Sequence, residues 1–389
     1  MRVLDRTMLV QALAEARADG WLLFDFQGVN PVLQQVLGIE GFGSRRLFVW
    51  LPRDGEPVAV AHRIELQSVA GFSGRVEPYS RWEELHAALV KVVRGRRVAM
   101  EISPDNAVPY LDRVPHGVVQ LVQQLGGTVV PSTALVTQFA SRWSDADVAD
   151  HLAAAEVLAA LARDTLTRAV RRTSEGLTES ALQHEVVNGI HAAGLVFEHP
   201  PIVGFGPNAA NPHYEPEPGA DRTLGADEVV LLDLWAGRRL GAVFADQTWM
   251  GFSGSAVPES VGKVWQTVRD ARDAAIVALT DALADGRQVY GYELDRAARG
   301  VIEAAGFGAH FVHRTGHSID HRLHGSGPHL DDYETHDDRP LVDGVGFSVE
   351  PGVYLTGQFG VRSEVNVYLR QGVVHVTPGE RQQELIRVA

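Results

Sequence analysis

Four carboxylates lie in apolar, strand-like stretches of the second half of the chain, at Asp233, Asp246, Glu350 and Glu364. Asp233 stands in the run VVLLDLW at 229–235, which has no other polar side chain except the indole. An ionised carboxylate in an apolar strand is very costly unless a cation or dense hydrogen bonding compensates its charge. Four such groups, with His317 in a glycine-flanked turn between the two pairs, predict a site for two metal ions.

The composition limits which atoms can hold these ions. The chain has 389 residues, of which 45% are hydrophobic and 22% charged, as in ordinary globular proteins of two or three domains. It contains no cysteine, which excludes disulfides, thiolate metal sites and a cysteine nucleophile. Any metal must therefore be bound by oxygen and imidazole ligands.

The formal net charge of −14 argues against a nucleic acid or an anionic membrane as the main partner. The first twenty residues alternate charged and apolar side chains and lack the apolar core of a signal peptide. No window reaches the 18 or more apolar residues of a membrane span. We therefore expect a cytoplasmic protein with no membrane partner.

Hydrophobic periodicity divides the chain into two domains, residues 1–140 and 141–389. In the first, helices and strands alternate as in a small α/β domain. Its expected elements are a helix at 5–19, a strand at 21–26, a hairpin of 46–51 and 57–61, a helix at 82–93, a strand at 97–101, a helix at 115–125 and a strand at 127–130. In the second, Ser144 is the expected N-cap of a helix to about residue 172, and further helices are expected at 178–193, 258–284 and 292–305.

The last predicted strand, 360–368, has one valine-rich face and one face with Arg362, Glu364, Asn366 and Tyr368. Such a face is either a solvated outer surface or the lining of a site. Histidines are concentrated nearby, because seven of the 16 fall between residues 310 and 336. Most of these are expected to be structural, but Gly316 allows the backbone at His317 to approach a site closely.

The motifs that contain these residues resemble those of the pita-bread metallopeptidases, the creatinase, aminopeptidase P and prolidase family. They are GPNA (206–209) with PHY (212–214), LD (232–233), ADQT (245–248), GHSI (316–319), FSVEPGVY (347–354) and VRSE (361–364). The resemblance covers residues 143–389 and implies an α+β fold. It places a C-terminal pita-bread catalytic domain, a curved antiparallel sheet covered by helices, after a creatinase-like N-terminal α/β domain.

The resemblance also implies a role for each residue of the site. Asp233 binds one metal, Asp246 and Glu364 bridge both, and His317 and Glu350 complete the sphere of the second. The expected cofactors are two divalent ions per subunit, with Mn first and Co, Zn or Fe as alternatives. A hydroxide held between the two metals is the expected nucleophile.

Four further residues have expected roles around the metals. Glu350 also transfers the proton from the metal-bound water, while His213 and His324 contact the substrate and the tetrahedral intermediate. Tyr214 and Arg362 support the ligands from outside. The expected reaction is hydrolysis of small, proline-containing peptides by a homodimer of the Xaa-Pro peptidase branch, as either a dipeptidase (prolidase) or an aminopeptidase P.

The sequence departs from the family pattern around the site. Gly325 follows His324 where the family commonly has glutamate, and Ser318 and Asp320 stand where it has glycines. His336 occupies the position of the arginine that binds the substrate carboxylate in prolidases, with Arg339 three residues later as a second candidate for substrate binding. The interval of 13 residues from Asp233 to Asp246 also exceeds the family's usual spacing, which predicts a longer hairpin loop.

These departures leave alternatives open. A peptidase of the same fold with another chain-end specificity, such as a carboxypeptidase, is one. A catalytically silent pita-bread binding protein is a second, although such relatives typically lose metal ligands and all five are present here. A creatinase-like or lyase-like enzyme acting on other substrates is a third.

Overall fold

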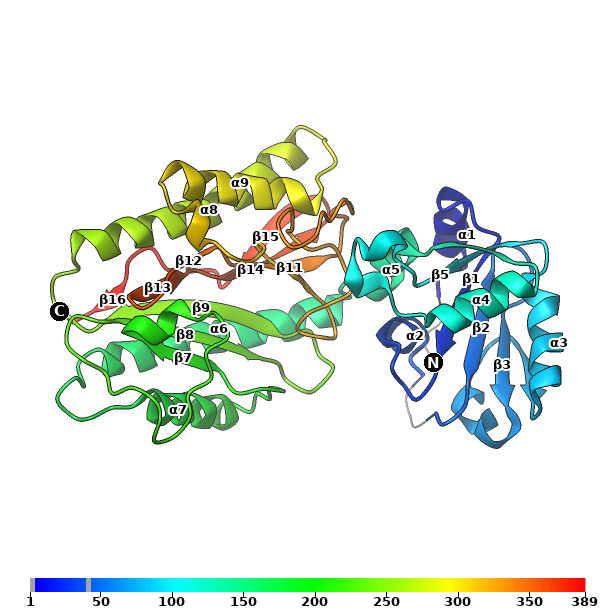
Figure 1. The fold of residues 1–389 in the computed structure, drawn as a ribbon, viewed down its shortest axis with the longest axis horizontal. Helices are drawn as coiled ribbons and strands as arrows, with labels where there is room; N and C mark the ends of the chain where they lie inside the picture. Colours follow the sequence, from blue (N-terminus) through cyan, green and yellow to red (C-terminus); the bar gives the residue numbers. More distant parts are fainter. Residues whose placement is uncertain (1–3, 40–42, 389) are drawn as a thin grey trace. The chain divides into compact units, whose positions relative to one another are not determined.

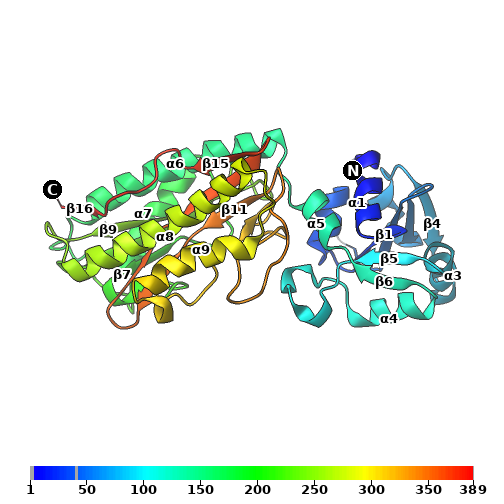
Figure 2. The ribbon, with the colours of Figure 1, turned by 90° about the horizontal axis from the view of Figure 1, so that it is seen from above.

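The computed structural model describes residues 4–39 and 43–388, which form two compact units, Met1–Ser141 and Arg142–Ala389. Figure 1 shows the ribbon of each unit, and Figure 2 shows the same ribbon from above. None of the helices in the described part of the chain has the length and apolar character needed to cross a membrane.

The first unit is a six-stranded sheet with helices on both faces. Its strands are β1 (Gly20–Asp25), β2 (Leu47–Pro52), β3 (Val58–His62), β4 (Arg75–Tyr79), β5 (Arg97–Met100) and β6 (Thr128–Pro131), in the order β4-β3-β2-β1-β5-β6. Its helices are α1 (Arg6–Glu15), α2 (Pro31–Leu37), α3 (Trp82–Val93), α4 (His116–Gln124) and α5 (Thr133–Ala140). Short 3₁₀ helices occupy Arg63–Val69, Pro104–Asn106 and Pro109–Leu111.

Alternation along β1 explains why both faces of this sheet are covered. Trp21 and Leu23 belong to the core formed with α1, α2 and α5, whereas Leu22 and Phe24 belong to the core formed with α3 and α4. Successive side chains of a strand point to opposite faces, so an uninterrupted apolar run needs helices on both sides. The predicted hairpin of β2 and β3 is confirmed, with Gly55 at φ 101° in its turn.

The second unit contains long helices and three groups of strands. The helices are α6 (Asp145–Ala169), α7 (Glu179–Ala192), α8 (Glu259–Ala284) and α9 (Gly291–Ala304). The strands are β7 (Ile202–Phe205), β8 (Val229–Ala236), β9 (Ala245–Phe252), β10 (Ser318–Ile319), β11 (Gly346–Val349), β12 (Gly352–Leu355), β13 (Phe359–Arg362), β14 (Val365–Arg370), β15 (Val373–Thr377) and β16 (Ile386–Arg387). Two 3₁₀ helices lie at Gly206–Ala210 and Gly308–His310.

The strands of this unit pair as β16-β9-β8-β7, β10-β11-β14-β15 and β12-β13. Helices α6 and α7 cover one side of β7–β9, and α8 and α9 lie on the other side of the strands, as Figure 1 shows. The pairings between β7 and β15 are antiparallel, as the fold class predicts, and the short strand β16 adds one parallel pairing at the edge of β9. The loop 237–244 lengthens the β8–β9 hairpin, as the 13-residue interval predicted.

Helix starts agree closely with their sequence signals. Ser144 caps α6 with a capping box, in which its hydroxyl accepts from the Asp147 N–H and the Asp147 carboxylate accepts from the Ser144 N–H. Thr178 likewise accepts from the N–H of Ala181 at the start of α7. The helix expected at 5–19 is shorter than predicted and ends at Glu15, because Arg17 adopts a positive φ of 50°.

The single strand expected at 360–368 is wrong. Ser363 and Glu364 interrupt it, so that β13 pairs with β12 while β14 pairs with β11 and β15. The segment passes from one pair of strands to another, and Glu364 lies in the break. All residues from 360 to 368 are buried, which excludes the solvated outer face.

Candidate metal centre

Antiparallel pairing of β8 and β9 brings the first two carboxylates together. Asp233 lies opposite Thr248, and Asp246 is two residues from Thr248 on the same strand, so the three side chains share one face of the hairpin. Both aspartates are buried, with 6% and 4% of their surface exposed. The prediction that the two apolar strands place their carboxylates at one site therefore agrees with the register.

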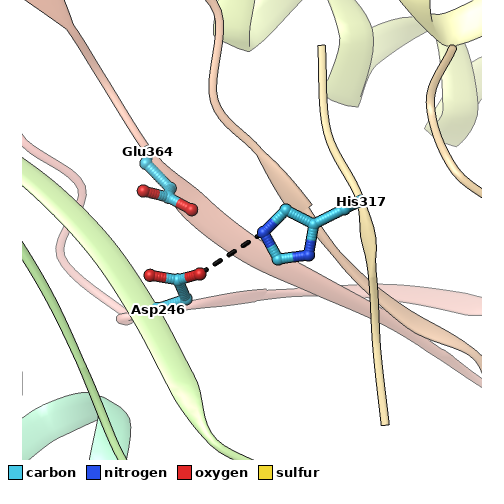
Figure 3. Close-up of side chains that lie close together, drawn as sticks. All are labelled: Asp246, His317 and Glu364. Carbon is cyan, nitrogen blue, oxygen red and sulfur yellow. Dashed lines mark ion pairs between the residues drawn. The ribbon is translucent and has the colours of Figure 1, made fainter. Parts of the chain in front are cut away.

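Glu364 joins this face from the break between β13 and β14. Its Oε2 accepts a hydrogen bond of 2.8 Å from Thr248 Oγ1, and its own N–H donates to the Thr248 carbonyl. At this break the Glu364 side chain turns toward Asp246, as Figure 3 shows.

His317 precedes the short strand β10, and its orientation is set by two hydrogen bonds. The His317 N–H donates to Ser348 Oγ at 2.9 Å, and Nδ1 contacts the Ser318 carbonyl at 3.1 Å. Nε2 consequently faces the cluster, 3.4 Å from Asp246 Oδ2 and 3.4 Å from Glu350 Oε1. One potential ligand atom from each of Asp246, His317 and Glu364 lies within 4.8 Å of the others (Figure 3).

Glu350 follows β11, where Pro351 ends the strand. Ser348 Oγ donates to Glu350 Oε1 at 2.9 Å while it accepts from His317, so one hydroxyl orients two members of the cluster. Ser348 was not identified from the sequence. Its position two residues before Glu350 was an available signal, because alternate residues of an extended segment share a face.

Arg362, the last residue of β13, contacts the face that carries Asp233 and Thr248. Its guanidinium forms an ion pair with Asp233, and its Nε donates to Thr248 Oγ1 at 2.8 Å. Arg362 contributes one positive charge against four carboxylates. The cluster therefore keeps a large excess of negative charge in a buried setting.

The protonation of the cluster reflects this excess. Burial raises the pKa of Asp233 to about 7 against the lowering effect of Arg362. Burial also raises the pKa values of Asp246 and Glu364, and the charge of Glu350 adds to the rise at all three groups. Burial would raise the pKa of Glu350 too, but the nearby His317, His313 and Arg362 lower it to about 2. Burial lowers the pKa of His317, and Asp246 and Glu350 raise it by more.

Three oxygen atoms of the cluster are buried acceptors without a hydrogen-bond donor in the described part of the chain, as expected of cation ligands. Asp233 Oδ1, Asp246 Oδ1 and Glu364 Oε1 are buried and accept no hydrogen bond from the described residues. Buried acceptors without donors are rare in folded proteins, and a metal ion satisfies them directly. The donor set of carboxylate oxygens with one imidazole fits divalent cations of the Mn, Fe, Co and Zn type.

Of the other residues predicted around this cluster, His324 contacts it, whereas His213 and Tyr214 hydrogen-bond residues outside it. The His324 ring lies edge-on against His317 with centroids 4.2 Å apart, and the charge of His317 lowers the pKa of His324. His213 is an exposed loop residue whose N–H donates to Asn211 Oδ1. The hydroxyl of Tyr214 donates to Glu179 at 2.7 Å, so it supports Glu179 and no member of the cluster.

The two candidates for binding a substrate carboxylate already have partners. His336 is exposed, and its Nδ1 lies 2.6 Å from Asp332 Oδ1. Arg339 is 1% exposed, donates through Nε and Nη2 to Asp337, and donates through Nη1 to the Ser326 carbonyl. Arg339 thus anchors the loop that follows His324. Both His336 and Arg339 are paired with an aspartate outside the cluster, so neither offers it an unpaired charge.

Comparison with known proteins also indicates a metallopeptidase. Residues 152–371, more than half of the chain, match Metallopeptidase family M24. The "Probable dipeptidase PepE" of Mycobacterium tuberculosis is 29% identical over 336 residues, which cover 84% of this chain and 82% of that protein. The "Xaa-Pro dipeptidase" of Lactobacillus delbrueckii subsp. lactis is 34% identical over 163 residues, 42% of this chain and 40% of that protein.

Solved structures match along nearly the whole chain. Dipeptidase PepE from Mycobacterium ulcerans superposes with a TM-score of 0.75 at 25% identity and covers 98% of this chain and 96% of its own. The prolidase from Thermococcus sibiricus gives a TM-score of 0.69 at 24% identity with full coverage of both chains, a likeness of fold. The chain therefore belongs to metallopeptidase family M24, as a peptidase with the pita-bread α+β fold that its motifs predicted.

Proposed function

We propose that this peptidase binds two divalent cations through Asp233, Asp246, His317, Glu350 and Glu364 and hydrolyses Xaa-Pro dipeptides. The observation that carries the proposal is the set of buried oxygens of Asp233, Asp246 and Glu364 that have no donor among the described residues. The relatives named dipeptidase and Xaa-Pro dipeptidase support the choice of substrate. When bound, the cations polarise the peptide carbonyl and lower the pKa of water at the site.

The chain's own residues supply the proton transfer and the orientation. Glu350 is ionised at neutral pH and lies beside His317, so its carboxylate is available to transfer a proton from the nucleophilic water to the leaving nitrogen. Ser348 keeps its carboxylate in place through a hydrogen bond. His324, beside His317, is a neutral donor for the charge that develops on the substrate carbonyl oxygen, and His213 is proposed as a second contact.

A second candidate activity is an aminopeptidase P that accepts longer peptides. Arg339 is fully engaged with Asp337 and Ser326, and His336 pairs with Asp332, so neither offers the free bidentate fork that holds a dipeptide's carboxylate. An enzyme without that fork tolerates substrates that continue beyond the proline. The same argument keeps a carboxypeptidase-like specificity as a third outcome of the test.

The deciding experiment compares Ala-Pro, Ala-Pro-Ala and N-acetyl-Ala-Pro as substrates of the full chain, before chelation, after chelation and after Mn²⁺ is restored. We expect activity to disappear on chelation and return with Mn²⁺, with Ala-Pro cleaved fastest. Faster cleavage of Ala-Pro-Ala favours the aminopeptidase, and cleavage of the acetylated substrate favours the carboxypeptidase. Hydrolysis that survives complete metal removal contradicts the two-metal proposal.

Metal binding is measured separately from catalysis by titrating Mn²⁺ into the chelated protein in a calorimeter. The wild type should bind two ions, and Asp246→Asn or Glu364→Gln should weaken binding by at least about tenfold. Glu303→Gln, an exposed glutamate of α9, is the matched control and should bind as the wild type does. Manganese as the physiological metal, a homodimeric assembly and a cytoplasmic location are likewise proposals, tested by metal analysis, sedimentation and fractionation.

A further inference from the structure

A cavity of about 330 Å³ lies in the first unit, far in sequence from every residue of the metal centre. It forms at one end of the six-stranded sheet. Strands β1, β3 and β4 end there and β2 begins there, because Asp25 pairs with Leu47, Phe48 with Val60, and His62 with Tyr79. Ligands commonly bind beyond the ends of strands, where side chains from several strands converge.

One side of the cavity is aromatic. Phe24 forms a buried part of the wall at 3% exposure, whereas Phe26 and Trp82 border it with 41% and 61% of their surface exposed. Single exposed apolar residues are ordinary, but two large aromatic rings bordering the same cavity form an apolar surface suited to a flat ring.

The other side is cationic. Arg45 and Arg46 line the cavity, and none of its lining residues is an aspartate or glutamate, although the whole chain carries a net charge of −14. Neither guanidinium pairs with a carboxylate of the described residues. Arg45 donates to its neighbour Ser44. The Arg46 backbone carbonyl accepts a hydrogen bond of 2.7 Å from the Tyr79 hydroxyl, and the Arg46 side chain also hydrogen-bonds Tyr79, another residue of the cavity lining.

Two guanidinium groups beside an aromatic surface are suited to a ligand that has both a negative charge and a flat ring. We propose that this cavity binds a small aromatic carboxylate, with the ring against Phe26 and Trp82 and the carboxylate on Arg45 and Arg46. Guanidinium groups bind carboxylates in a bidentate manner, and aromatic faces bind rings with little loss of side-chain entropy. The site is separate from the peptidase centre, so it does not depend on the function proposed above.

The test uses 3-phenylpropionate as the probe, titrated by calorimetry into the full chain after chelation, so that no metal ion binds its carboxylate. Two further probes remove one feature each: 3-phenylpropanamide lacks the charge and propionate lacks the ring. We expect 3-phenylpropionate to bind at least about tenfold more tightly than either. Equal binding of the acid and its amide, or no saturable binding below millimolar concentration, overturns the proposal.

Variants then locate the site. Arg46→Gln combined with Arg45→Gln should weaken 3-phenylpropionate about tenfold or more, and Trp82→Ala should weaken it severalfold. Arg94→Gln is the matched control, because Arg94 is an exposed arginine at the end of α3 that does not line the cavity. Circular dichroism verifies that each variant is folded. Undiminished binding to the double variant, or equal weakening by the control, places the ligand elsewhere and contradicts the assignment.

Discussion

Glu350 differs from the other carboxylates of the cluster in its affinity for protons. The pKa of Asp233 is raised to about 7 by burial, while the histidines and Arg362 around Glu350 lower its pKa to about 2 against the effect of burial. Groups with opposite shifts in one site commonly perform different tasks. Glu350 is thus ionised at neutral pH even before any cation binds, and its carboxylate is available for proton transfer.

Replacing Glu350 with Gln should remove this acceptor while keeping the volume and the hydrogen bond from Ser348. We expect the rate of Ala-Pro hydrolysis to fall by about 10²- to 10⁴-fold, the usual contribution of general acid–base catalysis. The unfolding midpoint should change little. Glu303→Gln is again the control, and a Glu350→Gln enzyme with an unchanged rate would refute the proton-transfer role.

Glu101 in the first unit gives a prediction about pH. It is fully buried and accepts hydrogen bonds from Trp21, Asn30 and Ser132. Burial raises its pKa from 4.5 to about 7, and the three donors only partly oppose this. Between pH 4.5 and 7 the folded chain therefore keeps a proton on Glu101 that the unfolded chain releases. This proton's contribution to the stability of the folded state is complete below pH 4.5 and is lost as pH rises through 7.

The measurement is urea unfolding of the wild type and of Glu101→Gln at pH 5 and at pH 8.5. From pH 5 to pH 8.5, the free energy of unfolding of the wild type should fall by on the order of 3 kcal/mol relative to that of the variant. Taking the difference between the two proteins cancels other titrating groups, such as His151. The same pH dependence in both proteins would contradict the assignment to Glu101.

Individual residues of the candidate metal centre could be proposed from the sequence where apolar neighbours make a charged side chain costly to bury. A carboxylate in an apolar run such as 229–235 requires compensation wherever the strand lies, so Asp233 could be identified without the fold. The partners of Arg339 and Tyr214 were not predictable in this way. Both depend on which distant segments the fold brings near them, Ser326 and Asp337 in one case and Glu179 in the other.

At the scale of elements, the close approach of β10 and β11 depends on a glycine. A Cβ at Gly316 would lie 2.0 Å from the carbonyl oxygen of Ser348, which is backbone and cannot move aside. Gly316→Ala should therefore displace His317 and destabilise the protein by about 2 kcal/mol or more. Thermal unfolding and Mn²⁺ titration of the chelated protein measure the two effects, and wild-type values for both would contradict the argument.

Gly300 provides the contrasting glycine. It is exposed within α9, and a Cβ there would meet no atom within 4 Å. Gly300→Ala should stabilise the protein by about 0.5 to 1 kcal/mol, since alanine restricts the unfolded chain and favours helix. A loss of stability would show that the Gly316 result reflects a general intolerance of substitution.

Most elements could be predicted because their signals are local. Capping residues such as Ser144 and Thr178, and apolar residues at helical spacing, depend on neighbours only a few positions away. The break at Ser363 and Glu364 could not be predicted, because the alternation from 360 to 368 continues through it. The change of pairing partner from β12 to β11 and β15 is decided by long-range contacts that alternation does not contain.

At the scale of the whole molecule, all five proposed ligands belong to the second unit, 142–389. Cations that bind only the folded state stabilise it by about 2.7 kcal/mol when their free concentration is 100 times the dissociation constant. Mn²⁺ should therefore slow hydrogen exchange in β8, β9 and β14 of the chelated protein and leave β1 and β5 unchanged. Asp246→Asn should remove the effect, and equal protection of both units would contradict a site confined to the second.

The fold class could be predicted more fully than the specificity of the enzyme. The change from alternating helices and strands to long helices near residue 141 is a property of composition along the chain. We expect specificity to depend on segments such as the loop after β10, in which Asp320 accepts hydrogen bonds from the N–H groups of Arg322 and Ser326. Their conformations result from polar contacts, which leave no periodic pattern in the sequence.

The ion pair between Arg362 and Asp233 also has a consequence for biosynthesis. The two residues are separated by 129 positions, so the ribosome completes β8 long before it adds the arginine that neutralises this strand's carboxylate. Until then, a nascent β8–β9 hairpin carries two acidic groups that favour water over an apolar core. Residues 229–252 should consequently reach their folded conformation late in translation, after Arg362 has been added, and the proposed metal site should form no earlier.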